Sequence, residues 1–191
     1  MKKSIILLFC IFIFSCSKNK KTQTKYIKHN IEFLNWNLNI PENYISVSFE
    51  EYKNIVSESF NDSIALNKKL LSVEILEKKI TTPYVFFIDK NNIENTLIIN
   101  SLLNPIPNKY FKDEIAVELH SDFRKKGETQ GYIYKPMENK LINDWLIKIK
   151  GEKDFTELNT KIYNTIYFSN NFGAIVTSTN KELDFEKEMT E

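Results

Sequence analysis

Hydrophobic side chains recur every three or four residues in two neighbouring regions of the chain. Residues 49–59 have this spacing, and Ser48 with Glu51 forms a capping-box pattern at their start. Residues 64–79 repeat the spacing after a polar break. The spacing predicts two consecutive helices, each with an apolar stripe facing a core. The stripe of the second helix is expected to contain Leu66, Leu70, Val73, Leu76 and Ile80.

A longer helical pattern covers residues 108–126, where apolar residues are spaced by four. Gly127 follows it in the position of a C-terminal cap, because glycine adopts the left-handed conformation at low cost. Residues 181–191 carry a shorter, charged pattern. We therefore expect a long helix in the middle of the chain and a short one near residue 191.

Between these helices, apolar and polar residues alternate, which predicts strands with one face in a core. The alternation breaks near Leu34, where we expect a bulge or a slip of register. Turn formers fill residues 89–92 and 135–139, and Gly151 is expected to end a strand. The predicted strands are 31–40, 44–47, 84–88, 96–99, 132–134, 145–149, 160–168 and 172–178. The expected fold is α+β, an antiparallel β-sheet built from hairpins with helices packed on its faces, in two or three layers.

The start of the chain has a composition of its own. Residues 1–3 are basic at Lys2 and Lys3, residues 5–14 are apolar throughout, and residues 15–17 are small. This order is that of a secretory signal peptide. The apolar run is about half of the ~20 residues that a membrane-spanning helix needs, so a permanent span is disfavoured.

The segment Ile13-Phe14-Ser15-Cys16 resembles the lipobox of bacterial lipoproteins, although Phe14 is bulkier than the small residue in many such boxes. The resemblance implies cleavage before Cys16 by the type II signal peptidase and attachment of a diacylglyceryl group to its sulfur. Two acyl chains anchor a protein stably. The alternative is ordinary cleavage after Ser17, because Ser15-Cys16-Ser17 also fits a small-x-small site.

Cleavage before Cys16 divides the chain into three parts. Residues 1–15 are the signal peptide, residues 16–30 a lipidated flexible tether, and residues 31–191 a single α+β domain. The tether is too polar to form a core. We expect the protein in the bacterial cell envelope, on the outer rather than the inner membrane, with the lipid membrane as a partner through acylated Cys16.

Charge and cysteine content exclude several classes of protein. Removal of the signal lowers the basic residues from 26 to 24, against 25 acidic ones, and Arg124 is the only arginine. Nucleic-acid binding needs a basic face, so no nucleic-acid partner is expected. Cys10 leaves with the signal and Cys16 is blocked by lipid, which leaves the domain without thiol or disulfide chemistry.

Histidines offer no predicted metal or catalytic site. His120 lies beside acidic residues, but its helical neighbours four positions away are Ala116 and Arg124, and neither binds metal. His29 lies in the expected tether. We therefore interpret His120 as a residue on a polar helix face.

Paired acidic residues have structural explanations. Asp113-Glu114 and Glu50-Glu51 fall in first helical turns, where negative charge suits the helix dipole. The segment from Asp89 to Asn92 lacks the glycine and the distal glutamate of an EF-hand loop. We expect no enzymatic activity, no metal and no cofactor.

Tyrosines on the predicted strands suggest a binding surface. If Tyr132, Tyr134, Tyr163 and Tyr167 gather on an open sheet face, they favour a protein partner. If helices cover that face, the same residues form the rim of the core.

The order of elements carries a resemblance of its own. A predicted strand leads into the segment Asn39-Ile40-Pro41-Glu42-Asn43-Tyr44, and a central hairpin is predicted after a helix. The predicted strand Tyr163–Phe168 pairs with Ala174–Ser178, and a terminal helix follows. This pattern resembles the PsbP/Mog1-type fold. The resemblance implies a docking subunit of a membrane complex or a binding protein rather than an enzyme.

Two functions are consistent with these observations. The first is a docking or accessory lipoprotein in a cell-envelope complex, with a possible protein partner. The second is a small-ligand-binding or enzymatic domain with a pocket between sheet and helices. A cavity in which polar groups converge with His120 would favour the second.

Overall fold

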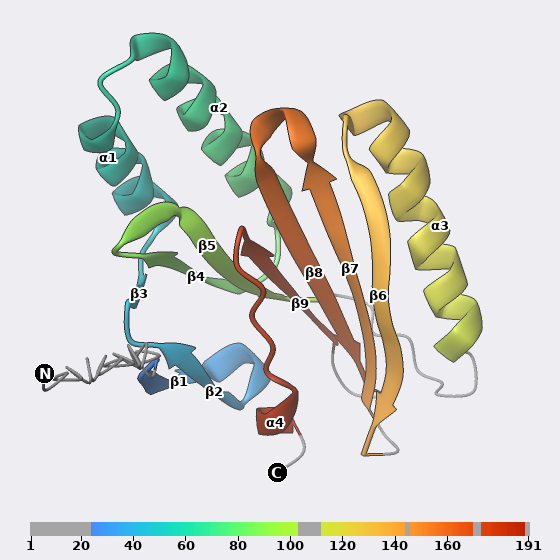
Figure 1. Ribbon diagram of the computed structural model, residues 1–191. Helices are drawn as coiled ribbons and strands as arrows, with labels where there is room; N and C mark the ends of the chain where they lie inside the picture. Colours follow the sequence, from blue (N-terminus) through green and yellow to red (C-terminus); the bar gives the residue numbers. More distant parts are fainter. Residues whose placement is uncertain (1–23, 103–111, 144–145, 170–172, 190–191) are drawn as a thin grey trace, which may run out of the picture.

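A computed structural model describes residues 24–102, 112–143, 146–169 and 173–189. It confirms the α+β prediction: helices cover one face of a central antiparallel sheet, and a β-hairpin covers part of the other (Figure 1). The signal peptide, Cys16, residues 108–111, Trp145 and the turn at residues 170–171 lie outside the described residues.

The central sheet has seven strands in the order β3-β4-β5-β9-β8-β7-β6, and every neighbouring pair is antiparallel. The strands are β3 (Tyr44–Ser46), β4 (Tyr84–Asp89), β5 (Asn92–Ser101), β6 (Ile133–Ile142), β7 (Leu146–Phe155), β8 (Thr160–Phe168) and β9 (Gly173–Thr179). The last of them in sequence, β9, lies in the middle of the sheet and joins β5 to β8. The prediction for residues 160–168 is confirmed to the residue.

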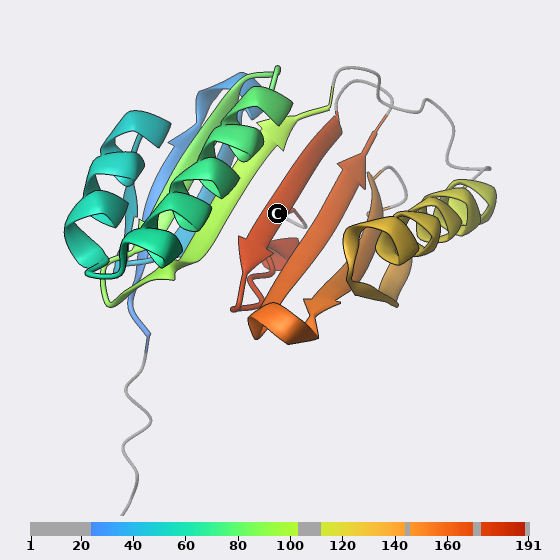
Figure 2. The ribbon, with the colours of Figure 1, turned by 90° about the horizontal axis from the view of Figure 1, so that it is seen from above.

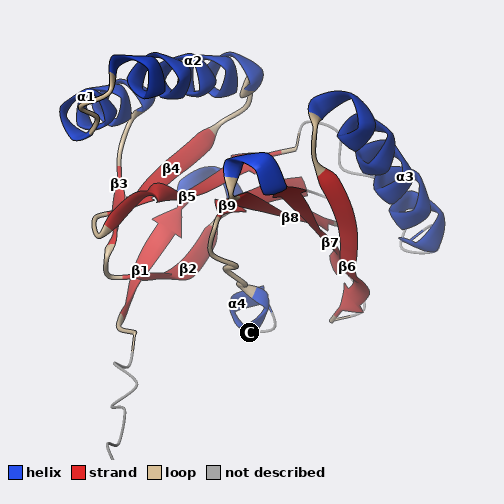
Figure 3. Ribbon diagram, turned by 45° about the horizontal axis from the view of Figure 1, so that its top comes forward, coloured by secondary structure: helices blue, strands red, loops and turns tan. Residues whose placement is uncertain are grey.

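Three helices lie on the same face of this sheet (Figures 2 and 3). They are α1 (Phe49–Ser59), α2 (Ser63–Lys79) and α3 (Lys112–Gln130). The first two pack on β4 and β5 through a cluster that includes Val56, Val73 and Phe86, whereas α3 packs on β7 and β8 through Ile115 and Ala116. The capping box at Ser48 is confirmed, because its hydroxyl accepts from the Glu51 amide at 3.1 Å and the Glu51 carboxylate accepts from the Ser48 amide at 2.7 Å.

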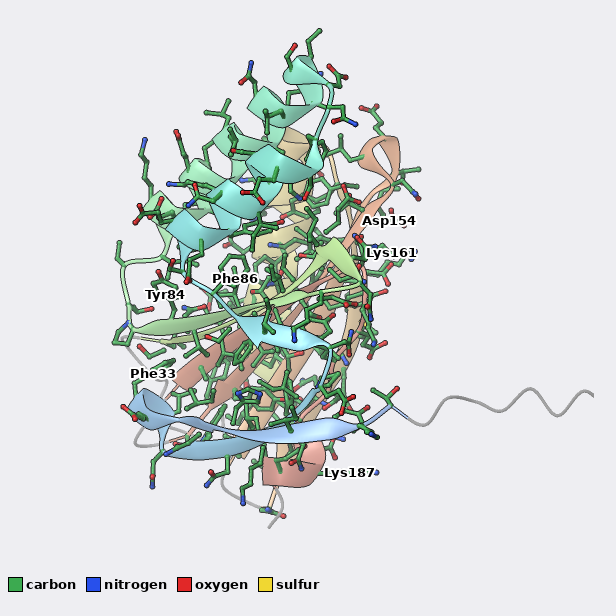
Figure 4. All side chains as sticks on the ribbon, turned by 90° about the vertical axis from the view of Figure 1, so that its left-hand side faces the viewer. Phe33, Tyr84, Phe86, Asp154, Lys161 and Lys187 are labelled. Atoms are coloured by element: carbon green, nitrogen blue, oxygen red, sulfur yellow. The ribbon has the colours of Figure 1, made fainter. Side chains whose placement is uncertain are left out.

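The opposite face carries a third layer, made of β1 (Tyr26–Ile31), β2 (Trp36–Pro41) and the short α4 (Glu186–Met189). Its core includes Leu38, Ile40, Leu97, Tyr167 and Phe185, all nearly inaccessible to solvent. Figure 4 shows the layers from the side, with Phe86 between β4 and the helices and Phe33 on the hairpin layer.

The break in alternation near Leu34 is a hairpin turn and not a bulge. A single helical turn at Glu32–Leu34 and the left-handed Asn35 (φ 54°) reverse the chain, so that Tyr26–Ile31 pairs with Trp36–Pro41. The predicted tether is therefore too long, because residues 26–30 belong to a strand. The sequence does not indicate this strand, because five of the six residues of β1 are not buried and their side chains show no alternation of apolar and polar residues.

The predicted cap at Gly127 is also wrong. The helix α3 continues to Gln130, and Gly131, with a φ of +72°, follows its last residue. Gly127 is buried inside the helix, where a Cβ atom would lie 2.5 Å from the carbonyl oxygen of Tyr132. Close approach of the returning chain therefore accounts for this glycine.

The predicted turn at residues 135–139 and the predicted strand end at Gly151 are wrong as well. The strand β6 runs through both Lys135 and Asn139, with an irregularity between Pro136 and Glu138. Proline is tolerated there because β6 is an edge strand. Gly151 lies inside β7. A side chain does not fit at this position, because a Cβ atom would lie 2.0 Å from the Tyr134 hydroxyl.

The terminal helix predicted over residues 181–191 is reduced to Glu186–Met189. The preceding residues are not helical, and alternate side chains point to opposite sides. Leu183 and Phe185 enter the core, whereas Glu182 and Asp184 contact lysines of β7.

Candidate functional site

His120 lies half-buried on α3 and pairs with a tyrosine of β6. Its Nδ1 atom is 2.7 Å from the Tyr134 hydroxyl. Burial lowers the pKa of His120, with the charge of Arg124 acting in the same direction, and burial raises the pKa of Tyr134 to about 12. At neutral pH both groups are therefore uncharged, and the tautomer of His120 decides which of the two donates the hydrogen bond. The pair fastens α3 to the sheet, and His120 lines none of the four cavities described in this domain.

His29 has a partner that the sequence did not indicate. It lies on β1, and its ring meets the edge of Phe87 with centroids 5.0 Å apart. Its Nε2 atom is buried, and none of the described residues forms a hydrogen bond with it. This histidine thus belongs to the packing of the hairpin layer.

The four tyrosines do not share an open face. Tyr132 and Tyr134 are buried on the side of α3, and the Tyr132 hydroxyl donates to the carbonyl of Phe123 at 2.9 Å. Tyr167 is buried on the opposite side of the sheet, in the core below the hairpin layer. Only Tyr163 is half-buried. The tyrosine docking surface is therefore contradicted, and the alternative of core residues is confirmed for three of the four.

Lys153 lies among these aromatic rings without a carboxylate. Its Nζ atom is 4.6 Å from the ring centre of Phe123 and 5.3 Å from that of Tyr132. Burial lowers the pKa of Lys153 to about 8, and the charges of Lys126 and Lys79 add to the effect. Within the described residues it has no ion pair, so the rings provide its main electrostatic support.

A second group of charges binds the C-terminal segment to β7. The ammonium of Lys148 is completely buried and lies 2.7 Å from Glu138, 2.7 Å from Asp184 and 3.1 Å from Glu186. These three carboxylates come within 4.8 Å of one another, as metal ligands do. The lysine already occupies the position between them and satisfies all three acids. This group is a structural ion cluster.

The acidic pairs lie in first helical turns, as predicted, and Asp89 lies in a turn. Asp113 and Glu114 stand in the first turn of α3, as Glu50 and Glu51 do in α1. Asp89 accepts hydrogen bonds from the Asn91 amide at 2.8 Å and from the Asn95 side chain at 3.2 Å, which closes a turn.

The strongest candidate for function is the solvent side of α2. Ile64, Leu71 and Ile75 are 65%, 58% and 46% exposed. They are seven and four residues apart, so they form one line along the helix. Val73, on the opposite side of α2, is buried in the core together with the predicted stripe. The helix is therefore apolar on two sides, and the described part of the chain covers only one of them.

Three lysines accompany this apolar line. Lys68, Lys78 and Lys79 are exposed on the same side of α2, and none has an ion pair within the described residues. We use the term outer face of α2 for Ile64, Lys68, Leu71, Ile75, Lys78 and Lys79. This face was not predicted from the sequence, although the spacing of its apolar residues is present there, because the prediction assigned one apolar stripe to each helix.

Other exposed apolar side chains do not form such a line. Val117 on α3 is 70% exposed, but its neighbours one turn away, Asp113, Glu114 and the partly buried Ser121, are polar. Single exposed apolar residues of this kind are normal on protein surfaces. The outer face of α2 differs from them because its apolar residues are aligned.

Comparison with known proteins adds no family. No model of a known protein family matches the chain, and no curated protein matches it significantly. Among the described helices, none combines the length and the apolar character needed to cross a bilayer.

Proposed function

We propose that this protein is a membrane-anchored envelope lipoprotein that serves as a docking or accessory subunit, held by lipid on Cys16. The observation that carries the docking role is the aligned exposure of Ile64, Leu71 and Ile75 on α2. Exposed apolar side chains that gather on one face and are bordered by polar residues are typical of interaction sites. An enzymatic role has weaker support, because His120 is used in packing α3.

The position of α2 is consistent with this role. The first strand begins at Tyr26, ten residues after Cys16, so the lipid lies within about 35 Å of the hairpin layer even if the chain is fully extended. The hairpin layer and α2 lie on opposite faces of the central sheet (Figure 3). Stacked layers are about 10 Å apart. An anchor at Cys16 is thus joined to the hairpin side of the sheet, and α2 lies on the side opposite this point of attachment.

The anchor is tested by exchanging each cysteine of the chain separately. We expect Cys16→Ser to move the protein from the membrane to the soluble fraction, whereas Cys10→Ser, in the same signal, leaves it on the membrane. Intact mass of the membrane protein should equal residues 16–191 plus acyl chains. An unmodified chain that begins at Lys18 contradicts the proposal.

The docking role is tested by affinity purification after gentle solubilisation. We expect a partner at reproducible stoichiometry, retained by Val117→Gln and lost by Leu71→Gln. Both variants replace one exposed apolar residue of a helix, so a general effect on folding or solubility affects both. A chain that always purifies alone contradicts docking.

A further inference from the structure

We infer that the outer face of α2 binds an amphipathic helix of a partner protein whose apolar stripe is bordered by aspartate and glutamate. This inference rests on the proposed docking function and specifies the chemistry of its partner. It follows from the dimensions of the apolar line, the charges beside it and the position of α2 in the fold.

The dimensions of the apolar line suit a helix. Ile64 and Ile75 are eleven residues apart, which corresponds to about 16 Å along the helix axis, or three turns. Helices pack by placing such rows of side chains into the grooves of a neighbour. The backbone groups within α2 are bonded inside the helix, so the face offers no edge on which a partner could add a β-strand.

The charges beside the line favour an acidic partner. Lys68, Lys78 and Lys79 surround the apolar residues, and their ammonium groups have no ion-pair partner among the described residues. In a symmetric dimer through α2, the same surface of both copies comes together, and the lysines of one copy face those of the other. That arrangement is repulsive. Carboxylates on the partner would instead turn the three lysines into attractive contacts.

The position of α2 disfavours the membrane as the occupant. Lysines beside apolar residues also suit a surface of anionic lipid. However, the chain enters the fold at Tyr26, in the layer on the other side of the central sheet. With the anchor at Cys16, α2 lies on the side of the sheet opposite the point of attachment, so we take a protein partner as the occupant and a lipid adduct as the contrary outcome of the test.

The first experiment identifies the occupant in native membranes. Leu71 is replaced by a photo-reactive amino acid, Val117 is replaced in the same way as a control, and the adducts of the full chain are sequenced by mass spectrometry. We expect Leu71 to capture a protein segment with apolar residues at helical spacing and acidic residues beside them, and Val117 not to capture it. A lipid adduct, an adduct with a second copy, or a captured segment without acidic residues overturns the inference.

The second experiment measures the charge preference directly. The full chain, purified in detergent, is titrated with two designed helical peptides that share one leucine stripe and differ only in bordering it with glutamate or with lysine. We expect the glutamate peptide to bind at least about tenfold more tightly at low salt and to lose this advantage at high salt. The triple variant K68E/K78E/K79E should reverse the preference, and Val117→Gln should leave it unchanged. Equal binding of both peptides overturns the inference.

The two proposals fail in distinguishable ways. If fractionation shows the anchor and a partner co-purifies, but Leu71→Gln does not release it, the docking function stands and the assignment to α2 is wrong. If Leu71 captures nothing and the chain purifies alone, both proposals fail together.

Discussion

Replacement of Lys148 by methionine tests whether the buried ion cluster holds the C-terminal segment. The side chain is fully buried, and methionine fills nearly the same volume without the charge. Glu138, Asp184 and Glu186 would remain within 4.8 Å of one another without the ammonium between them. Breaking a buried ion pair by removing one partner costs about 3–5 kcal/mol. Because the three carboxylates are about one-third exposed and Lys140 still contacts two of them, we expect about 3 kcal/mol.

The assay is urea unfolding of a chain that lacks residues 1–15 and carries Cys16→Ser, with Lys161→Met as the matched control. Lys161 also pairs with a carboxylate of β7, that of Glu152 at 3.0 Å, but it is 44% exposed. Exposed pairs contribute about 0–1 kcal/mol. With a slope of about 2 kcal/mol per molar urea, Lys148→Met should lower the midpoint by about 1.5 M and Lys161→Met by less than about 0.5 M. Equal midpoints for the two variants would refute the reasoning.

The same variant has a defined pH dependence. Burial opposes ionisation of Asp184, but hydrogen bonding from Lys148 and the charge of Lys150 outweigh it, so the pKa of Asp184 is lowered in the folded protein. Its contribution is present above the unfolded pKa near 4 and is lost as the pH falls through the lower folded value. The difference between wild type and Lys148→Met should therefore be full at pH 7 and shrink toward pH 3. A difference that grows in acid contradicts this account.

Three further predictions concern single side chains. Gly151→Ala should lower the free energy of unfolding by about 1–3 kcal/mol, since its Cβ would displace Tyr134; an unchanged melting temperature contradicts this. Ser48→Ala should cost about 1 kcal/mol in guanidinium unfolding through loss of the cap, and a neutral result would show that the cap is dispensable. Lys153→Met should stabilise the protein below about pH 8, where burial of the charged lysine is costly. The gain should disappear as the pH rises from about 8 to 10.5, because the pKa of Lys153 is lower in the folded protein than in the unfolded chain. A gain that does not depend on pH contradicts this account.

Most elements of this fold could be predicted from the sequence because they have a regular period. The helices at Phe49–Ser59 and Ser63–Lys79 and the strand Thr160–Phe168 lie where apolar spacing places them. Three of the wrong predictions concern Gly127, Pro136 and Gly151, where a glycine or proline was taken as a local signal for a cap, a turn or a strand end. Gly127 and Gly151 are required by contacts with Tyr132 and Tyr134, respectively, and no local pattern reveals such a contact.

The outer face of α2 could not be predicted from the sequence for a different reason. The apolar residues of α2 that face the core and those that face solvent are equally visible in the sequence, but which side is covered depends on Phe86 and Ile98 of distant strands. The ion cluster was equally hidden, because Lys148 and Asp184 are 36 residues apart and meet only once β7 and the C-terminal segment are in place. Candidate sites that depend on tertiary contacts therefore required the structure.

The central position of β9 has a consequence for when the chain can fold. Its pairing with β5 brings Leu97 next to Ser178, and until that contact forms, β3-β4-β5 and β6-β7-β8 remain separate half-sheets with open edges. Contacts between residues so distant in sequence form slowly, because a long loop must close first. Most of the domain is therefore synthesised before β9 is available to join the two half-sheets into one sheet.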